Sequence, residues 1–159
     1  MALSIVEVLE EVGKAKTRED KRDVLKNKDS WALKALLQQN FHPDAKWLIP
    51  PGRPPYEETT TSADTSLMFE AKKLDYYTDP SPHRLPNVKR ESMFISLLER
   101  LSPDESKILI DIKDQKLSYK GLTYKLVKDT WPDLLPEQEE KSTTSVTEVE
   151  EPKPEVENV

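Results

Sequence analysis

The sequence predicts an all-α fold: a compact bundle of about six or seven short helices with a Pro-rich extended strap and a disordered acidic C-terminal tail. Apolar residues recur at the spacing of helix faces, and helix-start signatures precede several of these runs. No segment longer than residues 47–49 has the pattern of a strand. We expect one helical domain over residues 1–136, with the strap at residues 42–63, and the acidic tail at residues 137–159.

The first expected helix covers residues 4–13. Ser4 and Glu7 have the spacing of a capping box, in which a hydroxyl and a carboxylate each accept an amide hydrogen at a helix start. Gly13 is expected to end this helix, because glycine adopts the conformation of helix C-termini at little cost. Its apolar face consists of Ile5, Val8, Leu9 and Val12.

Two more helices are expected in the N-terminal third. Thr17 has a weaker start signature and opens a charged helix over residues 18–27. The apolar side of this helix is little more than Val24 and Leu25. A third start at Asp29 leads to a helix that ends near Asn40.

The strap interrupts this helical pattern. It contains five prolines, and each proline removes a backbone donor and fixes the backbone angle φ. Its apolar residues are too numerous for a free linker, so we expect them to hold the strap against the body: Trp47, Leu48, Ile49 and Tyr56.

Four helices are expected after the strap, over residues 66–76, 88–101, 103–114 and 122–130, with a Pro-rich break at residues 79–86. The clearest start is at Ser102, where Pro103 occupies the first helical position and Glu105 completes a capping box.

Charge separates the acidic tail from the body. Residues 137–159 contain eight acids and two bases, a net charge of −6 that equals the value for the whole chain. The body is therefore neutral overall, although a local basic patch remains possible. The tail has too few apolar residues to offset the entropy of ordering, which predicts disorder. Its role is left open between solubility, competition for a basic surface, and docking on a basic partner.

The composition excludes several kinds of catalytic site. The chain has no cysteine, and its two histidines, His42 and His83, each lie beside a proline in an expected loop. The three glycines are too far apart for a phosphate-binding loop. We therefore expect a protein that is not an enzyme and that has no cofactor and no metal. The lack of cysteines, the charged N-terminal segment and the absence of a run of ~18 apolar residues predict a cytoplasmic protein with no membrane segment.

The strap is the first candidate for a partner-binding site. Trp47, Arg53 and Tyr56 are residue types that are enriched at interface hot spots, and the prolines around them limit the entropy lost on docking. The alternative, which we favour, is that Trp47 and Tyr56 only anchor the strap to its own core.

The last two expected helices are the second candidate. Residues 103–131 have a helix–turn–helix-like pattern with a short connection, and Lys120, Lys125 and Lys128 are placed to neutralise phosphates of a nucleic acid. Acidic residues would oppose DNA, namely Asp129, Asp133 and those of the tail. Nucleic acid is therefore a possible partner that we do not favour.

Three stretches resemble an uncharacterised family of small proteins from contractile-tailed, myovirus-type bacteriophages, especially those of marine cyanobacteria. They are residues 4–9 (SIVEVL), residues 47–56 (WLIPPGRPPY) and residues 94–135, which include LLERLSP and YKGLT. This family has no assigned activity, so the resemblance implies a setting in an infected bacterium and no mechanism.

Our leading hypothesis is a non-enzymatic phage protein that acts as an adaptor or inhibitor on host or phage machinery through a protein partner. One alternative is a nucleic-acid-binding accessory factor in phage transcription or replication. The other is a minor virion or assembly component. The sequence does not predict the oligomeric state.

Overall fold

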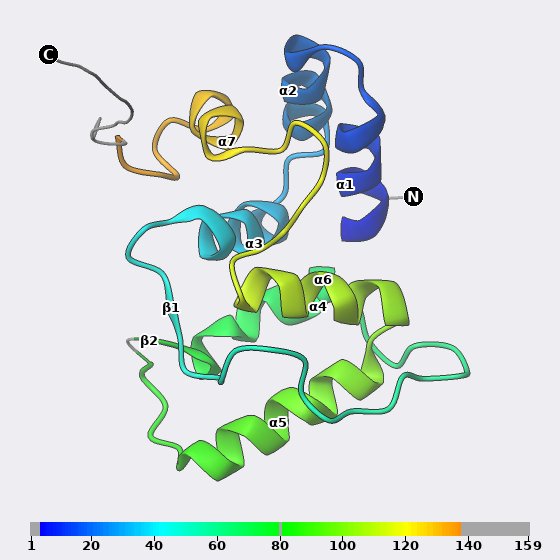
Figure 1. The fold of residues 1–159 in the computed structure, drawn as a ribbon, viewed down its shortest axis with the longest axis vertical. Coiled ribbons are helices and arrows are strands. Elements are labelled where there is room, and N and C mark those ends of the chain that lie inside the picture. Colours follow the sequence, from blue (N-terminus) through cyan, green and yellow to red (C-terminus); the bar gives the residue numbers. More distant parts are fainter. Residues whose placement is uncertain (1–3, 80, 138–159) are drawn as a thin grey trace, which may run out of the picture.

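The computed structural model describes residues 4–79 and 81–137, and it confirms the all-α class (Figure 1). Seven α-helices lie within these residues: α1 (Ile5–Lys14), α2 (Arg18–Asn27), α3 (Trp31–Phe41), α4 (Leu67–Glu70), α5 (Asn87–Arg100), α6 (Pro103–Lys113) and α7 (Tyr124–Thr130). A 3₁₀-helix, η1 (Ala71–Tyr76), follows α4, and two short strands, β1 (Lys46–Trp47) and β2 (Thr78–Asp79), form a small antiparallel sheet. The predicted disordered tail lies outside the described residues, apart from Glu137.

A serine or threonine begins six of the seven helices in the described part of the chain. The hydroxyl of each accepts the backbone N–H three residues later, which satisfies one of the amide groups that a helix start leaves without a partner. These residues are Ser4, Thr17, Ser30, Ser66, Ser102 and Thr123. Short helices in a highly charged chain therefore have starts that are fixed locally.

Several predicted helix limits differ from the structure by one or two residues. Gly13 lies inside α1 and does not end it, since the helix continues to Lys14. The third helix is capped by Ser30 and not by Asp29. The last helix begins at residue 124 because Thr123 provides its cap.

The segment predicted as a fourth helix over residues 66–76 is divided. Its first turn is α-helical, and the rest is the tighter 3₁₀-helix η1. The tighter winding ends at Tyr77, whose carbonyl accepts the N–H of Leu48 with an N···O distance of 2.7 Å. The strand β2 then pairs with β1, with Trp47 opposite Thr78. Strand β1 overlaps residues 47–49, the longest strand-like segment of the sequence, whereas the sequence pattern predicted no strand at β2.

One continuous hydrophobic core contains residues from all seven helices. Phe94 of α5 is fully buried, and the rings of Trp47 and Tyr77 contact it edge-on at centroid distances of 6.4 and 5.3 Å. In Figure 1, α5 lies at one end of the molecule, α3, α4 and α6 form the middle, and α1, α2 and α7 lie at the other end. None of the described helices has the length and apolar character needed to cross a membrane.

Candidate functional site

The strap is fixed to the end of α6 by a buried lysine and its neighbour. Lys113 Nζ donates to the carbonyl oxygen of Pro50 at 2.8 Å and to Asp114 Oδ1 at 2.6 Å. The N–H of Gly52 donates to both carboxylate oxygens of Asp114, at 3.2 and 3.1 Å. Gly52 has a φ of +94°, which favours glycine at this bend.

The rest of the strap follows the end of α5. The N–H of Glu57 donates to Glu99 Oε2 at 3.0 Å, and the N–H of Asp64 donates to the carbonyl oxygen of Arg100 at 2.9 Å. The strap is therefore connected to both helices that it crosses, and these contacts limit its movement.

Two of the three residues predicted to bind a partner through the strap pack against the core. Trp47 is half-buried against Phe94, and Tyr56 is only 8% exposed. Arg53 lies at the surface, with its guanidinium 4.4 Å from the centre of the Tyr56 ring and 3.6 Å from Glu58 Oε2. Of the three, Arg53 is the residue best placed to contact a partner.

The polar atoms of these two aromatic residues are buried without a hydrogen-bond partner among the described residues. Burial raises the pKa of the Tyr56 hydroxyl, an effect that the positive charge of Arg53 opposes and the negative charge of Glu58 reinforces. Since Trp47 Nε1 and Tyr56 Oη form no hydrogen bond there, both residues contribute to the fold mainly through their rings.

A small pocket of about 210 Å³ lies between the strap and α5. Its walls are formed by strap prolines together with Ile49, Phe94 and Ile95, and its charged lining residues are Arg53 and Glu91. The pocket is a mostly apolar recess with one charge of each sign.

The predicted helix–turn–helix geometry of residues 103–131 is wrong. The connection between α6 and α7 is not short but covers residues 114–123, and α7 packs against α2. Two buried leucines fold this connection onto the body, and the N–H of one of them, Leu117, donates to Asn40 Oδ1 at 3.1 Å. Helices α6 and α7 therefore do not form the compact pair that reads a DNA groove.

The three lysines predicted as phosphate contacts have different surroundings. Lys120 and Lys125 are exposed. Lys128 Nζ donates to the carbonyl oxygen of Pro132 at 2.6 Å and lies 3.5 Å from Glu137 Oε2. The structure thus leaves two of the three lysines exposed. The third, Lys128, binds the backbone that follows α7.

Asp129 on α7 pairs with a basic residue of α2. Arg18 forms a hydrogen bond and an ion pair with this carboxylate. The hydrogen bond from Arg18 is the main reason why the pKa of Asp129 is lowered, and the charges of Arg18, Lys125 and Arg22 lower it further. The positive charges of three residues therefore act on this one acid, and Arg18 is the one in direct contact with it.

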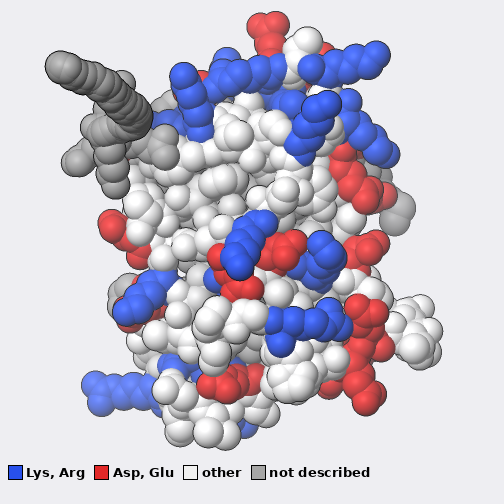
Figure 2. Space-filling view, in the orientation of Figure 1, with Lys and Arg blue, Asp and Glu red and all other residues white. Residues whose placement is uncertain are grey.

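We define the basic surface by Arg18, Arg22, Lys26, Lys120 and Lys125. The first three follow one another at a spacing of four residues, which places them on one side of α2. On the face shown in Figure 2, Lys and Arg side chains predominate at the end of the molecule where α1, α2 and α7 lie, although acids are visible at its tip and flank. The sequence between residues 116 and 128 contains four lysines and no acid.

The contribution of α2 was missed at the sequence level. The four-residue spacing of its basic residues was visible, but such a stripe usually marks solvated helix surface. Only the packing of α2 on α7, more than 90 residues later in the chain, adds Lys125 to this stripe.

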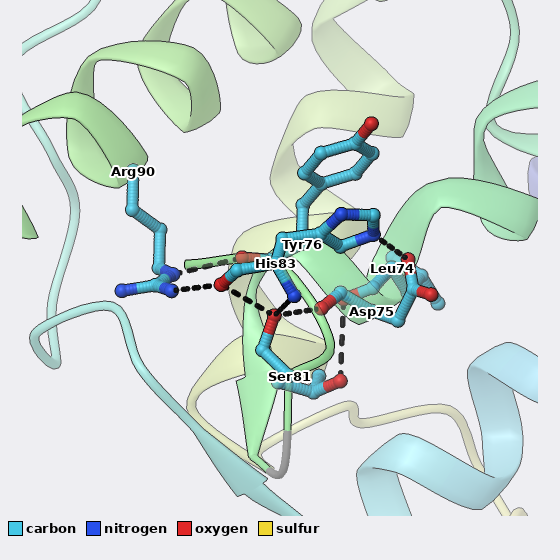
Figure 3. Close-up of polar contacts among 7 residues, drawn as sticks. Leu74, Asp75, Tyr76, Ser81, His83 and Arg90 are labelled. Atoms are coloured by element: carbon cyan, nitrogen blue, oxygen red, sulfur yellow. Dashed lines mark hydrogen bonds and ion pairs between the residues drawn. The ribbon is translucent and has the colours of Figure 1, made fainter. Parts of the chain in front are cut away.

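A second cluster of polar contacts joins the loop between β2 and α5 to the end of η1 (Figure 3). The ring of His83 stacks on Tyr76 at a centroid distance of 3.7 Å, and its Nε2 lies 3.3 Å from Asp75 Oδ1. Ser81 Oγ donates to the backbone oxygens of Asp75 and His83, at 2.6 and 3.4 Å, and not to the imidazole. These residues do not have the arrangement of a serine nucleophile with a histidine base.

Arg90 holds this loop from the side of α5 (Figure 3). Its guanidinium is part-buried and donates to the carbonyl oxygens of Tyr76, Leu85 and His83, at 2.8, 3.3 and 3.3 Å. Because the arginine satisfies backbone groups that the prolines of this loop leave outside regular structure, the cluster has a clear structural role.

Residues 8–119 match a protein family that is described as a family of unknown function (DUF6433). The matched region includes α2 and the strap and ends just before Lys120. No curated protein matches the chain.

Proposed function

The chain belongs to the DUF6433 family, and we propose that it is a non-enzymatic interaction protein that binds an acidic segment of a protein partner through the basic surface. The observation that carries this proposal is the packing of α2, which bears Arg18 and Arg22, on α7, which bears Lys125, with the Arg18–Asp129 ion pair joining the two helices.

The chemistry of the surface fits carboxylates. Arginine presents a planar set of donors that match a carboxylate, and lysine adds a point charge. One exposed ion pair contributes only about 0–1 kcal/mol, so binding requires several pairs formed together. The partner should therefore carry a run of acids that spans α2 and α7.

The strap supports the proposal less well. Trp47 and Tyr56 pack against the core, which leaves Arg53 as the exposed member of the predicted set. We therefore place the partner on the basic surface and not on the strap.

The resemblance to bacteriophage proteins supplies the proposed setting. In that setting the protein acts as an adaptor or inhibitor on host or phage machinery in the cytoplasm of an infected bacterium. Electrostatic attraction between a basic patch and an acidic segment would speed association with such a partner.

The test measures binding of a fluorescently labelled polyglutamate peptide to the full chain by anisotropy. Affinity should fall as salt rises, because exposed charges are screened over a Debye length of about 10 Å at 0.1 M salt. The double variant Arg22→Glu/Lys125→Glu should lose most of the binding. The control, Lys89→Glu/Lys107→Glu, makes the same change of charge at exposed lysines of α5 and α6 and should keep it. Equal affinities of the two double variants would overturn the proposal.

A nucleic-acid-binding accessory factor is the second candidate. The pairing of Asp129 with Arg18 favours it, because the negative charge of Asp129 would otherwise repel the phosphates of a nucleic acid. Because α6 and α7 do not form a helix–turn–helix unit, such binding would rely on contacts to the nucleic-acid backbone without sequence readout. Affinity for DNA or RNA should then fall steeply with salt and depend on Lys120 and Lys125 more than on Lys128. Undetectable binding at low salt removes this candidate.

A further inference from the structure

We propose that the acidic tail docks on the basic surface of its own chain and competes there with the acidic segment of the partner. This inference rests on the proposed function, since both use the same surface. It gives the tail a role as an internal occupant of the binding site.

The first observation is where the tail begins. Leu135 is buried, and the hydroxyl of Tyr124 donates to the carbonyl oxygen of Pro136, so the chain is held against α7 up to the start of the tail. The first acid of the tail, Glu137, already lies 3.5 Å from Lys128 Nζ. The tail therefore starts beside α7, the helix that carries Lys125.

The second observation is the complementarity of charge. Residues 138–159 contain seven glutamates and two lysines. The basic surface offers five cations, and Arg18 among them pairs with Asp129. The tail thus has the chemistry that the proposed function assigns to the partner.

The third argument is reach. The 22 residues from Gln138 to Val159 span at most about 75 Å when extended, whereas packed helices such as α2 and α7 lie only about 8–10 Å apart. A short tether gives an effective concentration on the order of millimolar. Ion pairs that are individually weak are then sufficient for docking within one chain.

The test of docking uses a nitroxide label. The chain contains no cysteine, so Ser145→Cys provides a single attachment site in the tail. Amide signals of α2 and of residues 120–125 should broaden more than those of α5, and high salt should remove the difference. Replacing the seven tail glutamates by glutamine should remove it too. Broadening that is uniform over the molecule, or that the glutamine variant retains, would overturn the inference.

Docking on a second copy is distinguished by mixing. An isotope-labelled chain without a nitroxide is mixed with a nitroxide-labelled chain that carries no isotope. Signals should remain sharp in this mixture if the tail docks on its own chain. Broadening of α2 in the mixture would show that the tail reaches another copy and would overturn the intramolecular inference.

The test of competition measures polyglutamate affinity. The chain with the glutamine tail should bind about tenfold more tightly than the natural chain, because no internal acid occupies the surface. A permuted tail of unchanged composition should behave like the natural tail. Equal affinity of the natural and glutamine chains overturns the inference and leaves the proposed function standing. No binding by either chain overturns the proposed function, while the nitroxide result still decides whether the tail docks.

Discussion

The side chain of Lys21 fills the space that a side chain at Gly121 would need. A Cβ at Gly121 would lie 2.4 Å from Lys21 Cε, and Gly121 has a φ of +78°. The Nζ of Lys21 donates to the carbonyl oxygens of Val12 and Ala15, both at 2.8 Å. One buried lysine therefore joins the end of α1, α2 and the connection before α7, beneath the basic surface.

Replacing Gly121 by alanine should destabilise the protein by about 1–3 kcal/mol, because alanine is strained at a positive φ and its Cβ would displace Lys21. Urea unfolding measures this loss. The control is Gly13→Ala, where the added Cβ would meet Tyr119 at an ordinary distance of 3.6 Å inside a helix. This control should raise the free energy of unfolding by roughly 0.5–1 kcal/mol. Similar losses in both variants would contradict the role given to Gly121.

Replacing Asp114 by alanine should loosen the strap. The amide of Gly52 loses its acceptor and Lys113 loses its anionic partner, at an expected cost of about 1–3 kcal/mol. Hydrogen exchange at Gly52 should become faster. As a control, Asp111→Ala removes only an exposed pair with Lys107 and should cost at most about 1 kcal/mol. Unchanged exchange at Gly52 would contradict the anchoring.

Replacing Tyr56 by phenylalanine should change stability by less than about 1 kcal/mol, because the buried hydroxyl has no hydrogen-bond partner among the described residues. Replacing it by alanine should cost about 3–5 kcal/mol, because the ring fills part of the core. Thermal unfolding of the two variants checks this. A large loss in the phenylalanine variant would mean that the hydroxyl has a partner.

Glu105 should make stability depend on pH. Burial raises the pKa of this carboxyl above its usual value of 4.5, while a hydrogen bond from the N–H of Leu67 opposes the shift. The folded state therefore holds its proton more tightly than the unfolded state. This contribution to stability is present below pH 4.5 and is lost as pH rises through the folded pKa.

The measurement compares the natural chain with Glu105→Gln by urea unfolding over a pH series. Relative to the glutamine variant, the natural chain should lose stability as pH rises through this window. The comparison removes the pH effects that both chains share. A constant difference between them at all pH values would contradict the prediction.

Replacing Asp129 by asparagine should strengthen binding of polyglutamate about two- to fivefold, because it removes a negative charge next to the basic surface and releases Arg18. The control is Asp44→Asn, an exposed acid between α3 and β1 that should leave affinity unchanged. Fluorescence anisotropy at low salt measures both. Weaker binding by Asp129→Asn would place the partner elsewhere.

The sequence predicts the helices well because their starts are determined locally, as Ser4 and Ser102 show. Long-range contacts change the outcome at particular residues. The sequence pattern assigned the Glu105 carboxylate to a capping box with Ser102, but the carboxylate instead accepts the N–H of Leu67 at 3.1 Å. Ser102 still accepts the N–H of Glu105, so this box forms only in part.

The basic surface was harder to predict for the same reason. In the sequence, nothing distinguishes Lys21 from the solvated lysines around it. Only the folded chain shows that it is 7% exposed and that its Nζ binds two backbone carbonyl oxygens. The packing of α2 on α7 is accompanied by the close approach of Lys21 to Gly121, which no local pattern indicates.

Helix α2 buries one apolar side chain completely, Leu25, whereas α3, α5 and α6 each bury several. Local opening of α2 should therefore need less free energy than opening of α3, α5 or α6. An acidic ligand that bridges α2 and α7 would bind only the closed form and would slow amide exchange along α2. Exchange rates in this one helix would then report how much of the protein is occupied, without any label on the ligand.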